Sequence, residues 1–366
     1  MQNNTLGILA LNSARQMGER VNRILGEWND GKNFLLPVEC PRFGSGEGKA
    51  ILPESVREKD IFIMVDICNS SVTYKMDSYI NHMSPDDHYQ DVKRVIAACN
   101  GEAARINVVM PFLYEGRQHR KTMRESLDCA MMLRELENMN VHTIITFDAH
   151  DPRIQNVTPL HGLLNIRPAL QFTQCLLTEY EDIQIDGDHL MFISPDEGAM
   201  ERVIFLATLF EVNVGMFYKR RDYTRIVDGV NPIISHDFCG GSVEGKDVIV
   251  VDDMISSGGS MLDVAAKLKD LHAKRVFLFS TFGLFTHGLE KFDKAYEKGL
   301  FDRVFTTNLI YQKPELLERP YYMSVGMGRF IAAIIQALHR GNSVQEFSFP
   351  ETGIRNMVNL YKSSRH

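Results

Sequence analysis

Short runs of apolar residues recur along the whole chain, separated by longer stretches of mixed polarity. Unbroken apolar runs of this kind are typical of parallel strands that are covered on both faces, and the stretches between them are long enough for helices. We therefore predict strands at 6–11, 61–65, 106–110, 143–147, 190–194, 212–218, 248–251, 275–280 and 304–307. The alternation of strand and helix patterns predicts an α/β fold with two doubly wound domains and parallel sheets.

The pattern runs through one set of β-α units and then restarts for a second set. With 366 residues the chain is long enough for two cores. No low-complexity segment marks the junction, and we place it near residue 165. The expected organisation is an N-terminal domain at 1–165, a second domain at 166–326, a helix at 327–345 that packs back on the first domain, and a tail at 346–366.

Composition and charge exclude several classes of protein. The net charge of −7 argues against a nucleic-acid-binding protein. The six cysteines are scattered without a C-x-x-C pair, which fits reduced thiols better than a zinc site or a disulfide framework. No stretch approaches the roughly 20 apolar residues of a membrane span, and no basic segment precedes the first apolar run. We expect a cytoplasmic protein.

The segment at 246–262, KDVIVVDDMISSGGSML, carries the clearest chemistry. An apolar strand ends in two adjacent acids, and a loop of small residues then leads into an amphipathic helix. Small residues let backbone N–H groups turn toward a ligand, while the helix directs its positive end into the same loop. This arrangement predicts a phosphate site formed by Ser256, Ser257, Gly258, Gly259 and Ser260.

The two acids of this segment, Asp252 and Asp253, come directly after the apolar run at 248–251. Ligands of open α/β sheets lie beyond the carboxyl ends of the strands. We therefore expect both acids to face the group that carries the phosphate, and sugar hydroxyls fit that position. A simple Gly/Ser turn followed by solvated acids is the alternative structure.

Two basic segments are candidates for binding a second anionic group. The segment at 111–126, PFLYEGRQHRKTMRES, contains four cations, although a charge run is also common on a solvated face. The run at 219–221, KRR, follows a predicted strand and precedes a polar segment with little periodicity, which we predict to be a mobile lid. The titratable pair Asp148 and His150 follows the predicted strand at 143–147.

Six segments in this order resemble motifs of the ribose-phosphate pyrophosphokinase family, the phosphoribosyl pyrophosphate synthetases. They are RFGSGE at 42–47, RQHRK at 117–121, TFDAHDPRIQ at 146–155, SPDEGA at 194–199, YKRRD at 218–222 and VVDDMISSGGS at 250–260. Any one of these motifs is weak, but six ordered matches over nearly the whole chain are specific.

The resemblance implies a reaction and a set of substrates. Enzymes of this family transfer a pyrophosphoryl group from the co-substrate ATP to the 1-hydroxyl of ribose 5-phosphate, with Mg²⁺ on the phosphates. By resemblance, the catalytic residues are Lys219, Arg221 and His150. The residues that the resemblance assigns to ATP are Phe43, Glu47, Arg117 and Gln118.

The resemblance also assigns the metal, the sugar and the assembly. His150 and Asp196 correspond to the metal and triphosphate positions, and Asp196 is the better direct ligand because Mg²⁺ prefers oxygen. Asp252 and Asp253 correspond to the residues that bind the ribose hydroxyls, and 256–260 to the loop that binds the 5-phosphate. A homo-oligomer, dimer or hexamer, is implied because the family's RFGSGE-type loop reaches the ATP site of a neighbouring subunit.

The chain departs from the family pattern at five positions, which are Ser45, His119, Glu197, Ala199 and Ser256. The region at 69–88 is also longer than the family pattern. Two alternatives therefore stay open at this point. One is a catalytically silent homologue that binds and regulates a synthetase, and the other is a phosphoribosyltransferase, which would leave the RQHRK segment and the first domain unexplained.

Overall fold

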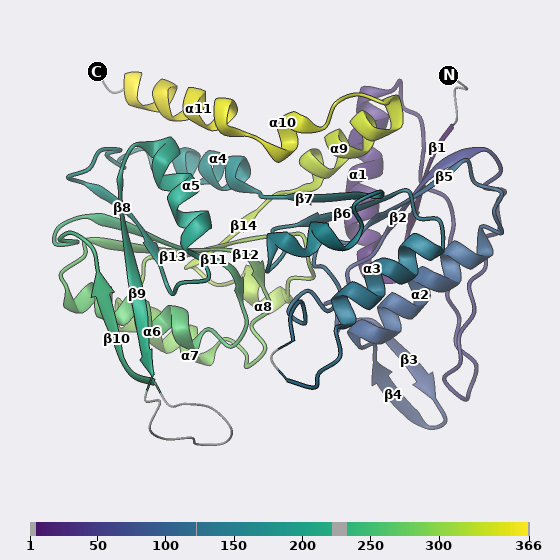
Figure 1. Ribbon diagram of the computed structural model, residues 1–366, viewed down its shortest axis with the longest axis horizontal. Helices are drawn as coiled ribbons and strands as arrows, with labels where there is room; N and C mark the ends of the chain where they lie inside the picture. The colour runs from purple at the N-terminus through teal and green to yellow at the C-terminus, as the bar shows by residue number, and fades with distance from the viewer. Residues whose placement is uncertain (1–4, 122, 222–232, 365–366) are drawn as a thin grey trace. The chain divides into compact units, whose positions relative to one another are not determined.

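The computed structural model describes residues 5–121, 123–221 and 233–364, and within these ranges the side chains of 219–221 and 233–236 are outside the description. The chain forms two compact units, which we describe separately (Figure 1). The first comprises Met1–Pro168, Asn308–Tyr311 and Gly326–Phe349. The second comprises Ala169–Thr307, Gln312–Val325 and Pro350–His366. The segment at 346–366, which we expected to be a tail, is therefore divided between the two units.

The first unit is built on a parallel five-stranded sheet. Its strands lie in the order β1 (Thr5–Ala10), β2 (Lys59–Met64), β5 (Arg105–Val109), β6 (Thr143–Phe147) and β7 (Gly162–Ile166). The order follows the chain without reversal. The main helices between these strands are α1 (Arg15–Trp28), α2 (Pro85–Ala98) and α3 (Asp128–Asn138).

Burial explains why the apolar runs predicted β1, β2, β5 and β6. In β2, Ile61, Phe62 and Ile63 have no exposed surface, so both faces of the strand are covered. Helix α2 begins at Pro85 because Ser84 and Asp87 form a reciprocal capping box ahead of it. Ser13, by contrast, caps no helix, and its hydroxyl accepts a hydrogen bond from the backbone N–H of Asp66 at 3.1 Å.

A buried charge cluster attaches the helix α9 (Gly328–Arg340) to the sheet of the first unit. Asp60 of β2 has no exposed surface and accepts hydrogen bonds from Arg105 and from the ring of His339, the latter at 3.0 Å. Burial alone would raise the pKa of Asp60, but the hydrogen bonds from His339 and Arg105 outweigh it and hold the pKa below its usual value. Phe147 of β6 packs against Phe330 of the same helix.

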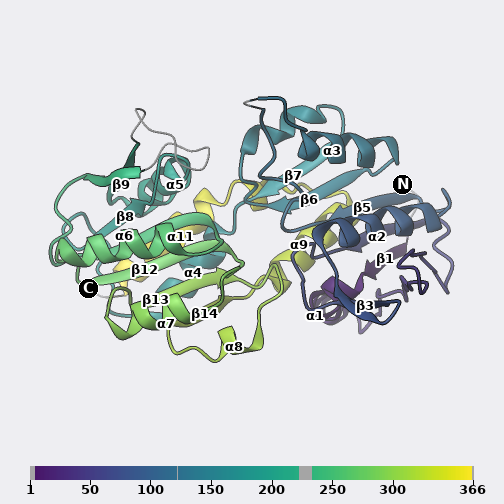
Figure 2. The same cartoon turned by 90° about the horizontal axis from the view of Figure 1, so that it is seen from below.

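The second unit contains a seven-stranded sheet, seen with its helices in Figure 2. Its order is β10 (Ile233–Cys239), β9 (Asn213–Arg221), β8 (Leu190–Ser194), β11 (Asp247–Ile255), β12 (Arg275–Gly283), β13 (Arg303–Thr307) and β14 (Tyr322–Val325). Only β10 is antiparallel to its neighbour. The expected α/β fold with parallel sheets is confirmed, and the second sheet has a reversal of strand order between β8 and β11.

The helices of the second unit are α4 (Ala169–Glu179), α5 (Met200–Phe210), α6 (Gly259–Asp270), α7 (Glu290–Glu297), α8 (Pro314–Leu317) and α11 (Glu351–Ser363). A further short helix, α10 (Gln345–Ser348), belongs to the first unit. Helix α11 buries Ile354 and Val358 and contacts α4 and α5. None of the helices in the described ranges is long and apolar enough to cross a membrane.

The region at 69–88, which we expected to exceed the family pattern in length, contains a hairpin of the first unit. Its strands are β3 (Thr73–Met76) and β4 (Tyr79–His82), which among the described residues pair only with each other. In Figure 1 this hairpin extends away from α2. Tyr79 and Ile80, near its tip, are largely exposed.

Candidate active site

The predicted phosphate loop lies between β11 and α6. Strand β11 continues past Val251 to Ile255, so the prediction that the strand stops before Asp252 is wrong. The extension is paired on one side only: β8 is in register with β11 as far as Val250, while β12 continues to Ile255. Asp252 and Asp253 therefore lie where β11 has lost its neighbour β8, which is the point at which the strand order reverses.

Gly258 shapes the turn from β11 into α6. It has φ +79 and occupies the N-cap position of the helix. A Cβ built on it would lie 2.3 Å from Cε2 of Phe292, whose side chain is fully buried. Only glycine fits this position without strain or displacement. The turn directs the first N–H groups of α6, which have no intrahelical acceptors, toward the loop at 256–260.

Asp253 is held by an arginine that the sequence analysis did not identify. Nη2 of Arg202, on α5, lies 3.7 Å from Oδ2 of Asp253, and the two side chains are 10% and 5% exposed. The signal for Arg202 was present in the sequence, because an arginine at this position of an apolar helix needs a buried acid. Two acids at the end of a strand supply that partner.

The ionised form of the Asp252 side chain is disfavoured. Burial is the largest cause that raises the pKa of Asp252 well above its usual value, followed by the negative charges of Asp253 and Asp196. Asp196 follows the end of β8, so its proximity to Asp252 agrees with the register of Ile193 with Val250. The structure therefore gathers three of the predicted site acids at one edge of the second sheet.

The loop after β8 is fixed by its own hydrogen bonds. Oδ1 of Asp196 accepts from the backbone N–H of Gly198 at 3.0 Å, and the hydroxyl of Ser194 donates to the carbonyl of Asp196 at 2.6 Å. Glu197, one of the departures from the family pattern, is exposed, whereas Ala199 is buried. The described residues contain no cluster of three or more side chains arranged to hold a metal ion.

In the first unit, two predicted motifs meet at the carboxyl end of β6. The rings of His119 and His150 lie 5.4 Å apart between centroids, and Nε2 of His119 lies 3.3 Å from Oδ2 of Asp151. Hydrogen bonds from Arg153 are the main cause that lowers the pKa of Asp151 to about 2. Nδ1 of His119 is buried without a hydrogen-bond partner among the described residues. Asp148, at φ +39, starts the sharp turn that carries His150.

The remaining predicted residues of the first unit are exposed or partly exposed. Arg117 is exposed, and Nε2 of Gln118 donates to the carbonyl of Ser126 at 2.8 Å. Phe43 is 54% exposed, and Glu47 accepts a hydrogen bond from the hydroxyl of Ser45 at 2.9 Å. Neither Phe43 nor Glu47 bonds to Arg117 or Gln118 in the part of the chain that the structure describes.

The predicted catalytic cations lie at the end of β9. The backbone of Lys219 and Arg221 belongs to this strand, and Lys219 is in register with His236 of β10. Their side chains, and the predicted lid at 222–232, lie outside the described residues.

Comparison with known proteins gives two matching family models and a set of relatives. The family model for the N-terminal domain of ribose phosphate pyrophosphokinase matches 6–139, and the phosphoribosyl transferase domain model matches 173–319. The chain is 30% identical to the ribose-phosphate pyrophosphokinase of Mycoplasma pneumoniae over 273 residues, which are 74% of this chain and 75% of the relative. It is 26% identical to ribose-phosphate pyrophosphokinase 2 of Schizosaccharomyces pombe over 348 residues, covering 94% of this chain and 97% of the relative.

A solved structure shows the same fold. The phosphoribosylpyrophosphate synthetase from Mycobacterium smegmatis superimposes with a TM-score of 0.75 at 20% sequence identity, covering 93% of this chain and all of the other. The sequence relatives and the two domain matches lead to one conclusion: the chain belongs to the ribose-phosphate pyrophosphokinase family.

Proposed function

We propose that this protein transfers the pyrophosphoryl group of ATP to the 1-hydroxyl of ribose 5-phosphate, giving 5-phosphoribosyl 1-pyrophosphate and AMP. The observation that carries the proposal is the acid pair Asp252 and Asp253 beside the Gly258 turn, at the strand reversal of the second sheet. That pairing of hydrogen-bond acceptors with a phosphate loop suits a sugar phosphate, and the chain belongs to a family named for this chemistry.

Ribose 5-phosphate would bind along the edge formed by β11 and α6. The loop residues Ser256, Ser257, Gly258, Gly259 and Ser260 would hold the 5-phosphate through backbone N–H groups and hydroxyls. Asp252 and Asp253 would accept hydrogen bonds from the 2- and 3-hydroxyls. The raised pKa of Asp252 supports this role, because the sugar hydroxyls would add donors to a carboxylate that accepts a hydrogen bond from the backbone N–H of Asp253 at 2.9 Å.

ATP would bind through residues of the first unit. Arg117 and Gln118 would hold the phosphates, and Phe43 and Glu47 would contact the nucleoside. The unpartnered Nδ1 of His119 supports a polar ligand at this place. His119 is one of the departures from the family pattern, which has a carboxylate at this position. Its ring lies close to the carboxylate of Asp151.

The ribose 1-hydroxyl would attack the β-phosphorus of ATP and release its proton to solvent, the bond from that phosphorus to the α,β-bridging oxygen would break, and AMP would leave. Charge grows on the non-bridging oxygens during this step, so catalysis depends on positioning and on nearby cations. Lys219 and Arg221 would supply two of them from the end of β9, and His150 would contact the triphosphate.

Mg²⁺ would neutralise part of the triphosphate charge. It is usually held by one or two carboxylates together with substrate phosphates. Asp196 fits such a partial site, because it adds to the negative charge that raises the pKa of Asp252. His150 would lie beside the metal rather than bind it directly. We also propose that the protein acts in the cytoplasm and as a homo-oligomer, as the loop at 42–47 suggests by resemblance.

The test is product analysis. Purified protein incubated with ATP, Mg²⁺ and ribose 5-phosphate should form AMP and 5-phosphoribosyl 1-pyrophosphate in equal amounts, and neither without the metal. ADP as the nucleotide product would refute the proposal. Ribose 5-phosphate and ATP that bind without turnover would instead support a catalytically silent homologue.

A further inference from the structure

The hairpin β3–β4 contacts the loop at 42–47 through one strand face. Side chains alternate along β3, so Tyr74 and Met76 lie on one face while Lys75 lies on the other. A Cβ built on Gly46 would lie 2.7 Å from Sδ of Met76, which means that Met76 packs directly against this glycine. The backbone N–H of Asp77 also donates to the carbonyl of Gly44 at 2.9 Å.

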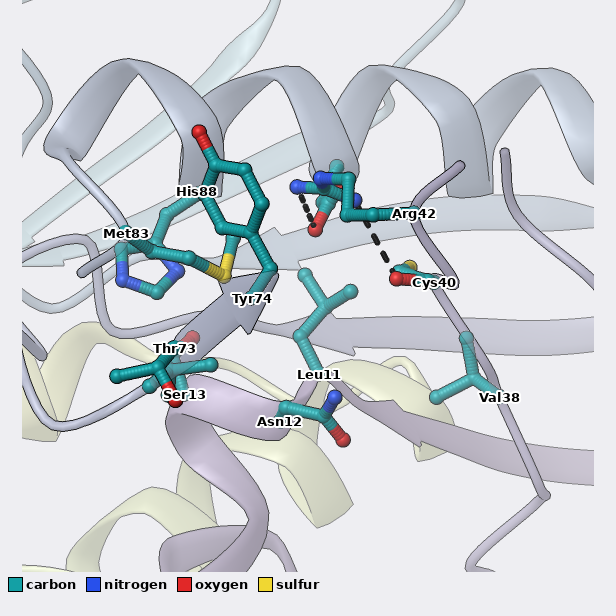
Figure 3. Close-up of a pocket in the computed structure, with 12 residues that line it drawn as sticks. Leu11, Asn12, Ser13, Val38, Cys40, Arg42, Thr73, Tyr74, Met83 and His88 are labelled. Carbon is teal, nitrogen blue, oxygen red and sulfur yellow. Dashed lines mark hydrogen bonds and ion pairs between the residues drawn. The ribbon is translucent and has the colours of Figure 1, made fainter. Parts of the chain in front are cut away.

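A second attachment runs through Arg42, the first residue of that loop. Its guanidinium lies over the ring of Tyr74, 5.4 Å from the centroid, and forms two hydrogen bonds to Asp91 of α2 at 2.8 and 2.9 Å. The Arg42 and Asp91 side chains are only 6% and 7% exposed. Figure 3 shows Arg42 and Tyr74 over the same pocket, which His88 and Met83 also line. A paired, forked contact of this kind fixes orientation as well as position.

The pocket beneath the hairpin is too small to be a nucleotide site. Its volume is about 50 Å³, which is room for a few water molecules at most. The hairpin therefore does not form a new ligand pocket. Its contacts go instead to the loop that carries Phe43 and Glu47.

That loop needs outside support to hold one shape. Gly44 and Gly46 give it freedom, and Gly46 has φ +90. Its internal hydrogen bonds are few among the described residues: the N–H of Phe43 donates to the carbonyl of Glu47 at 2.7 Å, the N–H of Gly46 to the carbonyl of Phe43 at 2.9 Å, and the hydroxyl of Ser45 to the carboxylate of Glu47 at 2.9 Å. A loop that is ordered before binding loses less entropy when its ligand arrives.

We propose that the β3–β4 hairpin is a positioning element for the nucleotide, in which Tyr74 and Met76 hold the loop at 42–47 in its ATP-binding shape. This inference rests on the proposed function, because it takes Phe43 and Glu47 as ATP contacts. Tyr74 and Met76 are positioning residues and touch no substrate. The length of the region at 69–88 then has a purpose in this chain, which is to order a glycine-containing loop.

The test compares two double variants of the same hairpin. Tyr74→Ala with Met76→Ala removes the face that meets the loop, and Lys75→Ala with Ile80→Ala removes a cross-strand pair on the opposite face. The first variant should raise the KM for ATP about tenfold, with the KM for ribose 5-phosphate and the melting temperature unchanged, because loop ordering affects one substrate only. The control should change none of these values.

A third variant tests the proposal if the first fails to fold. Thr73 and His82 are paired across the ladder, so a Gly-Gly turn can replace 74–81 and leave the base of the hairpin intact. It should show the same selective loss. An unchanged KM for ATP, an equal change in the control, or a parallel rise in the KM for ribose 5-phosphate would overturn the inference.

A binding measurement distinguishes failure of this inference from failure of the proposed function. If the wild-type protein forms no AMP, the proposed function fails, but the affinity for Mg²⁺-ATP can still be measured by titration calorimetry. Affinity about tenfold weaker in the Tyr74/Met76 variant than in the Lys75/Ile80 variant would support the hairpin's role. Equal affinities would refute it.

Discussion

Replacing Gly258 by alanine should damage the second unit far more than the same change at its neighbour. Gly258 has φ +79, and alanine in a left-handed conformation costs about 1 to 2 kcal/mol. The new methyl group would also lie 2.3 Å from Cε2 of Phe292. Overpacking of a well-packed core typically costs about 1 to 3 kcal/mol. The two effects together predict a loss of about 2 to 5 kcal/mol in the free energy of unfolding.

The ring of Phe292 has little room to relieve this clash. It is fully buried and makes edge contacts with Phe285 and Phe301, whose ring centroids lie 5.0 and 6.1 Å away. The turn before α6 must move instead, and the first N–H groups of the helix move with it. We therefore expect a raised KM for ribose 5-phosphate in addition to lower stability.

Gly259→Ala is the matched control. The atom nearest to a Cβ at this position is Oγ of Ser257 at 3.9 Å, and the residue has no positive φ. Its stability should stay within about 0.5 kcal/mol of the wild-type value. Urea unfolding of both variants measures the difference, and thermal unfolding should show Gly258→Ala melting roughly 5 to 15 °C lower. Equal stability of the two variants would refute the assigned geometry of this turn.

Three further predictions concern charges. Lys219→Ala should lower kcat about a hundredfold to a thousandfold, with little change in the KM for ribose 5-phosphate, because one transition-state cation is removed; steady-state kinetics showing only a KM effect would contradict this role. Asp252→Asn should raise the KM for ribose 5-phosphate, yet stabilise the unliganded protein. Burial, followed by the two neighbouring acids, raises the pKa of Asp252. The neutral side chain is therefore compatible with the folded protein at low pH, and stability is lost as the pH rises through that pKa and the side chain ionises. The melting temperature of the variant should therefore exceed that of the wild type at alkaline pH, and the difference should vanish in acid; a variant that melts lower at every pH would disagree. Asp60→Asn should cost about 2 to 4 kcal/mol in urea unfolding, because Arg105 and His339 lose their buried partner, and an unchanged midpoint would argue against this cluster as the attachment of α9.

The central strands could be predicted because burial on both faces leaves a continuous apolar run in the sequence. β6 and β8 match the predicted ranges, since every residue in them is buried. Two strands at sheet edges, β7 and β14, escaped prediction: β7 is only partly buried, and β14 mixes buried with half-buried residues. The extension of β11 through its two acids was missed because polar residues in a strand interrupt the apolar pattern that marks it.

The part of the candidate site that could be predicted is the part whose residues are contiguous in the chain. The acid pair, the small-residue loop and the start of α6 lie within one segment, so the sequence alone placed them together. The partner of Asp253 is Arg202, about fifty residues earlier, and no local pattern joins them. The contact of Met76 with Gly46 depends on the β3–β4 hairpin folding back on a loop, which periodicity cannot reveal.

The most direct test of the proposed pyrophosphoryl transfer follows the β-phosphorus of ATP. ATP labelled at this atom should be incubated with the purified protein, Mg²⁺ and ribose 5-phosphate, and the products separated. Pyrophosphoryl transfer predicts that the label leaves the nucleotide completely and appears on the sugar product, with unlabelled AMP released in equal amount. Label that stays in ADP, with only the γ-phosphate moved to the sugar, would contradict the proposed reaction.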